Sequence, residues 1–461
     1  MLNNIKLIII LAIIVYFVVL MMKKKISTII ALPTMGFVVA IVAAFGSMKD
    51  FGLFDTVVSG KVQMGILNGV INNGVTMMGS AIAAAIFGAA FATVLKKVGL
   101  AEKIIKTCAE LAGDRPMVIA IAFYIATVII FAAIGGLGAV ILIGSVALPI
   151  MMTAGIKEEI SASIVLLGLT TGGMLNAANY ATFAAVLAPT MNGDIGKATA
   201  TIVNIALPIF AVSFVISILF IMWHVGRKGF FKAWAVQNPA LKEKKQPKDR
   251  LGILAMISPI IPVLIIIVGQ IGFKVNIPVE VAIVIGIFYL LCIIKAERKL
   301  HILSASFIEG TQSVAGAIVL LIGLGILIKG FQFSAVTPII QPLILVLVSA
   351  LHTPLTYIIG FTIATPLVLY RGPLNTFGIG GALPVIFAAA GFSPIAIIWV
   401  LYSVGLTQGF ADPTNSQNIW ISDFVQVSPQ DITKRVLLWG IFMTLVVLCY
   451  AIFIAKISLV G

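Results

Sequence analysis

The amino-acid sequence predicts an all-α polytopic membrane protein that contains two inverted-topology repeats. Apolar residues make up 61% of the 461 residues and charged residues only 10%, and the mean hydropathy is +1.18. A water-soluble domain of this length is not so apolar, so most of the chain must be buried in lipid. The apolar runs are long enough for helices and lack the alternation of a membrane β-barrel.

Short motifs recur in the two halves of the chain, about 237 positions apart. The recurring pairs are Gly79 with Gly316, Gly88 with Gly325, Ala-Leu-Pro at 147–149 and 382–384, and Gly-Leu-Thr at 168–170 and 405–407. Each Gly-Leu-Thr is followed by a polar, helix-breaking run, at 172–179 and at 409–416. Interrupted hydrophobic segments at matching places in two halves indicate the binding site of a secondary transporter.

The first repeat is predicted to cover residues 1–224. Its first span is followed by three lysines at 23–25 and by no cleavage site, which predicts a retained span with a cytoplasmic C-terminal end. Residues 99–113 are amphipathic and predict a helix in the membrane interface. The predicted elements are spans at 7–22, 27–46 and 75–95, a re-entrant hairpin at 116–155, a broken span at 160–190 and a span at 198–223.

The hairpin prediction for 116–155 has an alternative. The run is apolar throughout and has a glycine-rich centre, Gly135-Gly136-Leu137-Gly138. Short arms and a glycine tip favour a re-entrant hairpin. Two full spans are the alternative, because both arrangements return the chain to the same side of the membrane and the basic residues cannot distinguish them.

A basic segment at 225–250 separates the halves and predicts a solvated cytoplasmic linker. It contains eight basic residues against Glu243 and Asp249, and two prolines. Basic residues clustered in loops between apolar segments also account for the net charge of +14, so we expect no nucleic-acid partner.

The second repeat is predicted to cover residues 251–461. The span at 75–95 runs inward by charge parity and its counterpart at 312–330 runs outward, so the repeats are predicted to be inverted. A further helix at 335–351 is expected to be interfacial or membrane-buried. The predicted elements are spans at 251–272, 279–295 and 312–330, a hairpin at 354–391, a broken span at 394–421 and a span at 436–458.

Four polar or glycine-rich places within the apolar segments predict an unwound backbone. They are the first tip at 133–138, the first break at 170–182, the second tip at 370–376 and the second break at 407–418. Such backbone is tolerated in a membrane only where protein or a water-filled cavity satisfies it. Glycine N–H groups, including that of Gly136, and helix N-termini attract anions, while exposed carbonyls attract cations.

Arg371 is the most informative single residue. An arginine inside an apolar stretch is costly, on the order of 3 kcal/mol on insertion scales, so it needs a partner or a function. Its planar fork suits a carboxylate, which predicts a clamp for an organic anion. A fixed ion pair with Asp412 and snorkelling to the interface are the alternatives.

Asp412 begins the second break, where Pro413 removes a backbone N–H. Asp412 can ligate Na⁺, carry a coupling proton or neutralise Arg371, and a helix-capping role without an ion is the alternative. A hard cation needs several oxygens, and Thr414, Asn415 and Ser416 supply them beside Asp412.

Asn176 and Asn179 in the first break are three residues apart, which places them on one helix face. They contact substrate or ion, or they form interhelical hydrogen bonds as structural glue. The same two alternatives, ligand contact or structural hydrogen bonding, apply to Thr170, Thr171, Asn375 and Thr376. As functional candidates, Thr170 and its counterpart Thr407 are assigned to ion coupling.

Motifs of soluble enzymes are missing from the sequence. It contains no Walker A pattern, no paired metal-ligand histidines and no nucleophile elbow, so we expect neither an enzyme nor ATP-driven transport. The three cysteines are widely spaced and suggest neither a metal site nor a disulfide framework. We therefore expect no cofactor.

The chain resembles the ion transporter superfamily, which includes the gluconate permease, citrate transporter, C4-dicarboxylate carrier and divalent anion symporter families. The resemblance rests on the inverted repeats, the hairpins, the broken helices and the amphipathic arms at 99–113 and 335–351. Divalent anion symporters carry Ser-Asn-Thr at both hairpin tips; here the second tip reads Leu374-Asn375-Thr376, and the first, Gly135-Gly136-Leu137-Gly138, departs from it. The resemblance implies an elevator movement of the hairpin domain against a homodimeric scaffold.

These observations predict a secondary transporter in the cytoplasmic membrane of a prokaryote, which carries a small organic anion, chiefly a carboxylate, with H⁺ or Na⁺. The predicted substrate-binding residues are Arg371, Asn375, Thr376, Asn176, Asn179, Gly136, Thr414 and Asn415. The predicted coupling residues are Asp412, Ser416, Thr170 and Thr407, with Na⁺ placed at Asp412 and Asn415. A cation/proton antiporter of similar architecture is the alternative, and a channel or a membrane scaffold is a third possibility.

Overall fold

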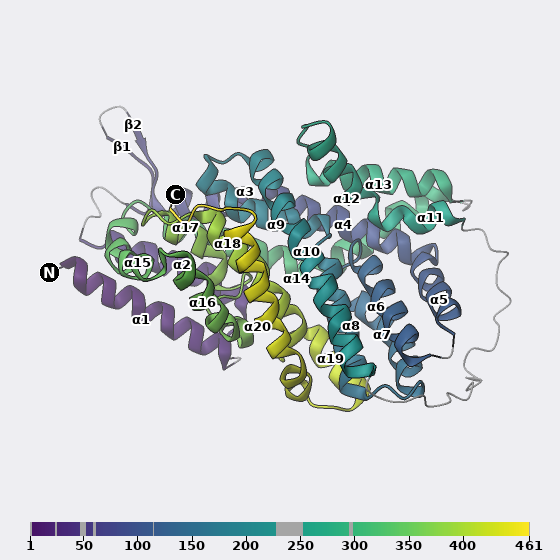
Figure 1. Cartoon of the computed structure of the whole chain (residues 1–461). Coiled ribbons are helices and arrows are strands. Elements are labelled where there is room, and N and C mark those ends of the chain that lie inside the picture. The colour runs from purple at the N-terminus through teal and green to yellow at the C-terminus, as the bar shows by residue number, and fades with distance from the viewer. Residues whose placement is uncertain are drawn as a thin grey trace.

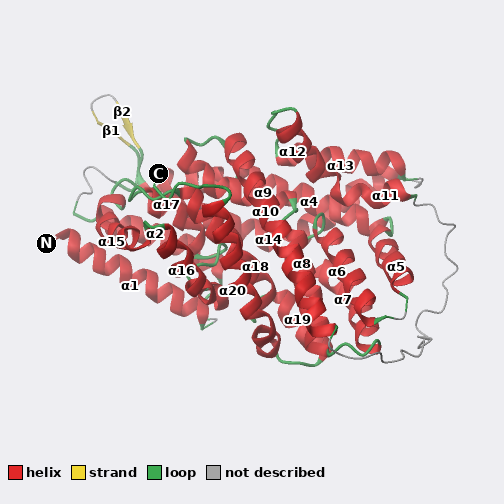
Figure 2. Cartoon of the chain, in the orientation of Figure 1, coloured by secondary structure: helices red, strands yellow, loops and turns green. Residues whose placement is uncertain are grey.

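The computed structural model describes residues 2–23, 25–46, 52–58, 61–113, 115–226, 252–294 and 298–460. These parts of the chain are almost entirely helical (Figure 2). Seven helices are long and apolar enough to cross a membrane, or nine if each of two bent pairs counts as one span. The predicted class, an all-α polytopic membrane protein, is confirmed. The predicted linker lies outside the described residues from 227 to 250.

The first half of the chain (Figure 1) contains the following elements. They are α1 (Leu2–Met22), α2 (Thr28–Ala44), β1 (Thr56–Val58), β2 (Lys61–Gln63), η1 (Leu67–Asn72), α3 (Asn73–Met77), α4 (Gly79–Lys97), α5 (Leu100–Ala112), α6 (Pro116–Phe131), α7 (Leu137–Thr153), α8 (Glu158–Gly173), α9 (Ala177–Leu187), η2 (Ala188–Met191) and α10 (Ile195–Val225).

The second half contains a similar series. Its elements are α11 (Ile253–Ile257), η4 (Ser258–Ile260), α12 (Ile261–Ile267), η5 (Val268–Gly272), α13 (Val279–Ile293), α14 (Lys299–Gln332), α15 (Thr337–Leu351), α16 (Pro354–Ala364), η6 (Thr365–Arg371), η7 (Ile379–Ala382), α17 (Leu383–Ala388), α18 (Pro394–Ala411), α19 (Ser416–Val425) and α20 (Pro429–Phe453).

The order of elements recurs between the halves. A long helix, an arm, two antiparallel pieces, a broken helix and a long last helix follow one another from α4 to α10 and again from α14 to α20. Helices α16, α18 and α20 each begin after a Ser or Thr followed by Pro, at 353–354, 393–394 and 428–429. The hydroxyl satisfies a free backbone N–H and the proline ring presets the first helical residue.

Helix α14 packs closely against α2 and the α3–α4 segment through pairs of glycines. A Cβ added to Gly325 would lie 2.0 Å from the carbonyl oxygen of Gly74, and one added to Gly330 would lie 2.4 Å from that of Gly36. Small residues allow such close backbone approach between membrane helices. An ion pair from Lys97 to Glu309, 2.7 Å long, also joins α4 to α14.

The first pair of antiparallel helices, α6 and α7, is short. The two helices contain 16 and 17 residues, which corresponds to about 24–26 Å, against a hydrocarbon core of about 30 Å. Gly136 at the turn has φ +85°, a conformation that other residues rarely adopt. Both features favour the hairpin over two full spans.

The second pair is less regular than the first. Helix α15 meets the α16–η6 segment at an angle of 107°, and the returning arm consists of η7 and the six-residue α17. The tip between the arms contains two successive residues in the left-handed region, Tyr370 and Arg371, with φ +54° and +61°. Each such residue stores strain of about 1–3 kcal/mol.

One element was not expected from the sequence. Strands β1 and β2 form an antiparallel pair in which Thr56 pairs with Gln63, between the predicted spans at 27–46 and 75–95. Asp55 closes this segment, because its carboxylate accepts from Gly65 N (2.8 Å) and from Asn68 Nδ2 (2.6 Å). These bonds hold the pKa of Asp55 below its usual value.

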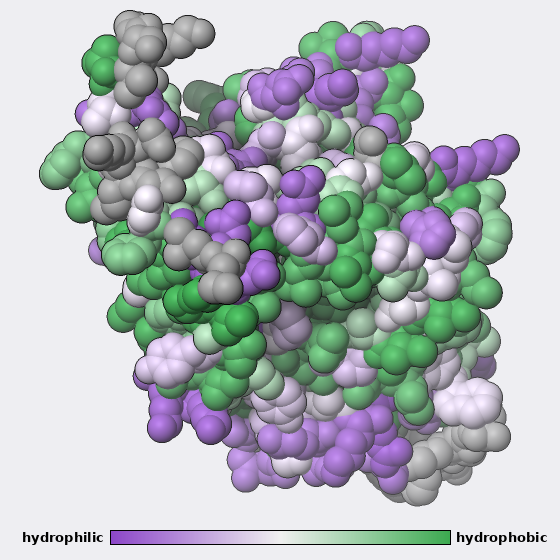
Figure 3. Space-filling view, turned by 90° about the vertical axis from the view of Figure 1, so that its left-hand side faces the viewer, coloured by the Kyte–Doolittle hydropathy of each residue, from purple (hydrophilic) through white to green (hydrophobic). Residues whose placement is uncertain are grey.

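The surface agrees with a membrane environment. In Figure 3, hydrophilic residues gather at the top and bottom of the visible face, and hydrophobic residues occupy the broad middle. Large apolar side chains such as Ile8, Phe288 and Leu438 are more than half exposed, as expected where they contact lipid.

Candidate functional site

The second break separates α18 from α19 at residues 412–415. Asp412 ends α18, and Pro413 cannot donate a backbone hydrogen bond. Asn415 begins α19, and its Nδ2 donates to the carbonyl oxygen of Gln408 (2.8 Å), which also accepts from Asp412 N (3.2 Å). The sequence signal and the observed break therefore coincide.

Asp412 is fully buried, and its two carboxylate oxygens differ. Oδ1 accepts from Thr414 N (2.9 Å), Thr414 Oγ1 (2.7 Å) and Tyr370 N (3.1 Å). Oδ2 is buried and has no hydrogen-bond partner among the described residues. Leaving a buried polar atom without a partner costs about 1–3 kcal/mol, and such atoms normally bond to an ion, a water or a ligand, so Oδ2 is the candidate ligand-binding atom of this break.

The second tip is held against this carboxylate by its own backbone. Tyr370 N donates to Asp412, and the left-handed residues Tyr370 and Arg371 turn the chain at this point. Strained residues of this kind persist only where the surroundings fix them, and they often mark binding sites. The second tip and the second break therefore form one unit.

Arg371 forms no ion pair with Asp412. Both residues are described, and Asp412 takes its hydrogen bonds from Thr414 and from the Tyr370 backbone instead. The Arg371 side chain is half-buried and has no hydrogen bond or ion pair with any described residue. The fixed pair that was one interpretation of the sequence is thus not formed, and the guanidinium is free to bind an anion.

Asn375 and Thr376, which follow Arg371 on the tip, are buried. Asn375 Oδ1 accepts from Phe377 N (2.9 Å), while Asn375 Nδ2 and Thr376 Oγ1 have no partner among the described residues. These two groups and the Arg371 guanidinium are uncommitted hydrogen-bonding groups on one short segment.

The first break, between α8 and α9, bends the chain by 60°. Asn176 caps α9, because its Oδ1 accepts from Ala178 N (3.0 Å), and its Nδ2 donates to the carbonyl of Phe131 (3.2 Å) at the end of α6. Asn179 Nδ2 donates to the carbonyl of Gly173 (2.7 Å). Both amides therefore form structural hydrogen bonds to backbone carbonyls.

The two broken helices touch where Thr170 meets Gly409. A Cβ on Gly409 would lie 2.1 Å from Thr170 Cγ2, and the Thr170 hydroxyl donates to carbonyls of its own helix. Thr407 faces Gly440 of α20 and its hydroxyl has no partner among the described residues. Of this pair of predicted coupling threonines, one is satisfied and the other is not.

Two predicted residues are exposed to solvent or lipid. Ser416 is exposed, and its hydroxyl donates to Gln417 Oε1 at 3.4 Å. Gly136 lies at the exposed first tip, where a Cβ would meet nothing within 4 Å. Neither residue is among those that bond to the Asp412 carboxylate.

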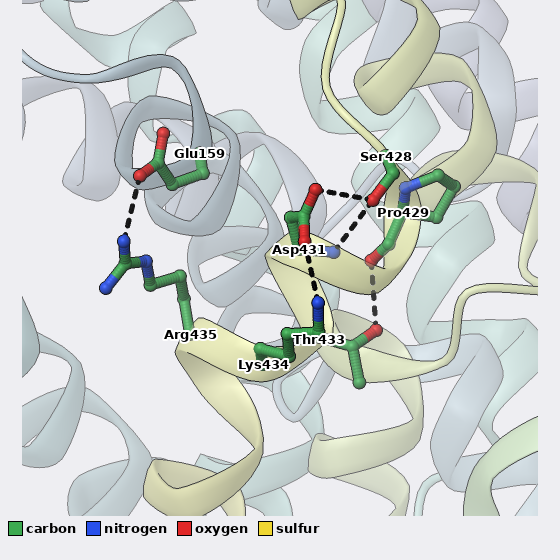
Figure 4. Close-up of polar contacts among 7 residues, drawn as sticks. All are labelled: Glu159, Ser428, Pro429, Asp431, Thr433, Lys434 and Arg435. Carbon is green, nitrogen blue, oxygen red and sulfur yellow. Dashed lines mark hydrogen bonds and ion pairs between the residues drawn. The ribbon is translucent and has the colours of Figure 1, made fainter.

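The first turns of α20 contact both halves of the chain, and Figure 4 shows their ion pair with Glu159 of the first half. Thr433 Oγ1 donates to the carbonyl of Ala411 (2.6 Å), the last residue before Asp412. Arg435 forms an ion pair of 3.2 Å with Glu159 at the start of α8. One helix end thus contacts both broken helices.

Several buried polar residues were not singled out from the sequence. The hydroxyls of Tyr180 and Tyr402 and the Oδ1 atom of Asn418 are buried without a partner among the described residues. The rings of Phe183 and Tyr402 lie 3.9 Å apart, which brings α9 beside α18. Helical periodicity alone cannot distinguish these residues from apolar core, because partner choice between helices is a long-range property.

The described residues contain no group of three or more His, Cys, Asp or Glu side chains that could hold a metal ion. A hard monovalent cation does not need such a group, because hydroxyl, amide and carbonyl oxygens can supply most of its ligands. Near Asp412 the Thr414 hydroxyl is one such oxygen, 2.7 Å from Oδ1.

The solved structures that are similar to this chain include two transporters. The YdaH transporter of Alcanivorax borkumensis, described as having an unusual topology, is 13% identical with a TM-score of 0.58 over 93% of this chain and 100% of that one. MtrF of Neisseria gonorrhoeae, from a class of antimetabolite efflux pumps, is 12% identical with a TM-score of 0.55 over 92% and 94%. No protein-family model and no curated protein sequence matches the chain. The similarity establishes the fold, and membership of the ion transporter superfamily stays a prediction.

Proposed function

We propose that this multi-pass membrane protein is an ion-coupled secondary transporter of a small organic anion, with a carboxylate as the favoured substrate, in the cytoplasmic membrane of a prokaryote. The observation that carries the proposal is the bare Oδ2 atom of Asp412, fully buried in a helix break. An acidic group in this position is suited to take up a proton or Na⁺, which coupling requires.

The anion would bind at the second tip, next to the coupling ion. Arg371 supplies a charge-matched fork, and Asn375 Nδ2 and Thr376 Oγ1 are unsatisfied groups on the same segment. Thr414 Oγ1 and Asn415 Nδ2 already bond to Asp412 and to the Gln408 carbonyl. These two atoms would therefore position the site rather than contact the anion. The first-break residues Asn176 and Asn179 would contribute through the backbone that they hold.

Coupling follows from the contact between tip and break. Tyr370 N bonds to the same carboxylate that would take up the ion, so ion binding changes the charge beside the anion site. A ligand shifts a conformational equilibrium only by its differential affinity for the two states. The ion would therefore favour the closed, loaded state by neutralising Asp412 while the anion neutralises Arg371.

The recurring order of elements supports inverted repeats and an elevator movement within a homodimer. The tips are tied to the broken helices by the Asn176–Phe131 and Tyr370–Asp412 hydrogen bonds, so they would move as one body. Helices α2, α4 and α14, joined by close glycine contacts, would form the static scaffold.

Substituting Arg371 tests the anion site. Charge-assisted hydrogen bonds contribute about 1.5–3 kcal/mol, so Arg371→Gln should raise the Kd of a bound carboxylate by about 10–150-fold. Purified protein would first be screened for carboxylates that raise the Tm with and without Na⁺, and the Kd would then be measured for wild type and variant.

Arg298→Gln is the matched control, because Arg298 is an exposed arginine before α14. Its Kd should equal that of the wild type. An unchanged Kd in Arg371→Gln would exclude the clamp.

A cation/proton antiporter remains the second candidate, because Asp412 has no cationic partner in the described part of the chain and Oδ2 is bare. Proteoliposomes that contain Asp412→Asn distinguish the two functions. An antiporter loses all transport, whereas a symporter keeps exchange of labelled anion across the membrane.

A further inference from the structure

A cavity of about 440 Å³ lies between two groups of elements, and none of the break or tip residues described above lines it. One wall comes from η1, α3 and the end of α14. The other comes from α15 and α17. Cavities of this size commonly hold small organic ligands.

Lys329 is the one charged side chain among the described residues that line this cavity. It is half-buried in the last turn of α14 and has no hydrogen bond or ion pair with any described residue. The helix C-terminus favours a cation there, but it leaves the three ammonium donors without partners. An anion in the cavity would supply a partner for the ammonium group.

The rest of the lining has both polar and apolar parts. Gln332 Oε1 is buried without a partner among the described residues, and Asn73 Nδ2 donates only to the weak acceptor Met64 Sδ (3.3 Å). Phe331 and Ile386 add apolar wall. The lining thus offers one positive charge, amide groups and an apolar surface.

We propose that this cavity is a second binding site, for an organic monoanion with an apolar body, whose oxyanion head binds Lys329 and whose body contacts the apolar wall. The proposal does not rest on the transport site at Arg371. A water-soluble aromatic acid and a fatty acid from the bilayer share this chemistry.

Benzoate is the probe, and its binding to full-length protein in phosphatidylcholine nanodiscs is measured by calorimetry. Wild type should bind benzoate with a Kd on the order of 1 mM or lower. Lys329→Gln should weaken this binding by about tenfold or more, because it removes a charge-assisted hydrogen bond. Lys274→Gln, which removes an exposed lysine outside the cavity, should bind like wild type.

Arg371→Gln separates the two sites. Benzoate binding that persists in Arg371→Gln but is lost in Lys329→Gln supports the cavity site, whether or not the transport site exists. Ile386→Trp fills the cavity from the opposite wall without changing charge, so it should also abolish binding. This variant tests the site even if Lys329→Gln fails to fold. Oleate that displaces benzoate identifies the bilayer as a source of ligand, and lack of displacement identifies a soluble acid.

Two results would overturn the proposal. One is the absence of benzoate binding to wild type at concentrations on the order of 10 mM. The other is equal binding to wild type, Lys329→Gln and Ile386→Trp, because the ligand would then occupy another place.

Discussion

The first and second breaks occupy the same place in the recurring order of elements, but their polar groups are satisfied differently. In the first, Asn176, Asn179 and Thr171 use their side chains to hold backbone or other side chains. In the second, Asp412 and Thr407 keep bare oxygens.

The same difference extends beyond the breaks. Of the twelve buried side-chain oxygen and nitrogen atoms without a partner among the described residues, two belong to the first half and ten to the second. Buried polar groups in folded proteins normally have partners, and exceptions indicate a bound ion, water or ligand. In the first break Tyr180 alone contributes such an atom, which is why we propose a structural role for Asn176 and Asn179 and ligand binding at the second break.

The largest expected effect comes from placing a charge in the first break. Asn176→Asp replaces a donor by an anion that faces the carbonyl oxygen of Phe131. An uncompensated buried charge should lower the free energy of unfolding by about 3 kcal/mol or more. Thermal unfolding in detergent would show a lower Tm.

Asn176→Ala is the control for that substitution. It removes the cap and the hydrogen bond to Phe131 but adds no charge, so a loss of about 1–2 kcal/mol is expected. If Asn176→Asp is as stable as wild type, the first break tolerates charge and the comparison fails.

A pair of Thr→Val substitutions gives a smaller effect and sharpens the comparison. Thr171 is buried, and its hydroxyl bonds to Ser213 (2.7 Å) and accepts from Tyr124 (3.1 Å), so Thr171→Val should lose about 1–2 kcal/mol of stability. Thr376 has no partner for its hydroxyl, so Thr376→Val should be neutral or slightly stabilising.

Ligand binding should show the reverse order. Thr376→Val is expected to weaken substrate binding several-fold, while Thr171→Val leaves it unchanged. Equal loss of stability in both variants would mean that the Thr376 hydroxyl is satisfied in the native protein.

The smallest effect concerns Asp55, a carboxylate outside both breaks. Its hydrogen bonds from Asn68 and Gly65 lower its pKa, so they stabilise this segment above the unfolded pKa of about 3.9 and are lost as the pH falls through the lower folded value. Hydrogen exchange at Gly65, corrected for its intrinsic rate, should speed up only in that acidic range. In Asp55→Asn this pH dependence should disappear.

The lowered pKa of Asp55 also limits its role in transport. Asp55 cannot produce a pH dependence of transport between about pH 5 and pH 8, because it stays ionised throughout that range. Transport by Asp55→Asn should therefore keep the wild-type pH profile, and an altered profile would contradict this assignment.

The sequence predicted the helical class and the positions of both breaks, because Gly, Pro, Asn and Asp act locally on the backbone. Pro413 and the cap Asn415 fall where α18 ends and α19 begins. The basic residues left the choice between a re-entrant hairpin and two spans at 116–155 open, because both place the following segment on the same side of the membrane.

The sequence could not predict which groups bond to one another across helices. An ion pair between Arg371 and Asp412 was a reasonable alternative, yet the carboxylate accepts from Tyr370 N, which depends on a left-handed turn at the tip. The exposed position of Ser416 and the unsatisfied hydroxyl of Tyr402 likewise depend on how distant helices pack.

The central claim is that the second break, and not the first, carries the coupling ion. The most direct measurement is substrate affinity in nanodiscs as a function of pH and Na⁺ for wild type, Asp412→Asn and Asn176→Ala. Affinity should depend on H⁺ or Na⁺ in wild type and in Asn176→Ala, and this dependence should disappear in Asp412→Asn. An ion dependence that survives in Asp412→Asn, or one that is lost in Asn176→Ala, would contradict it.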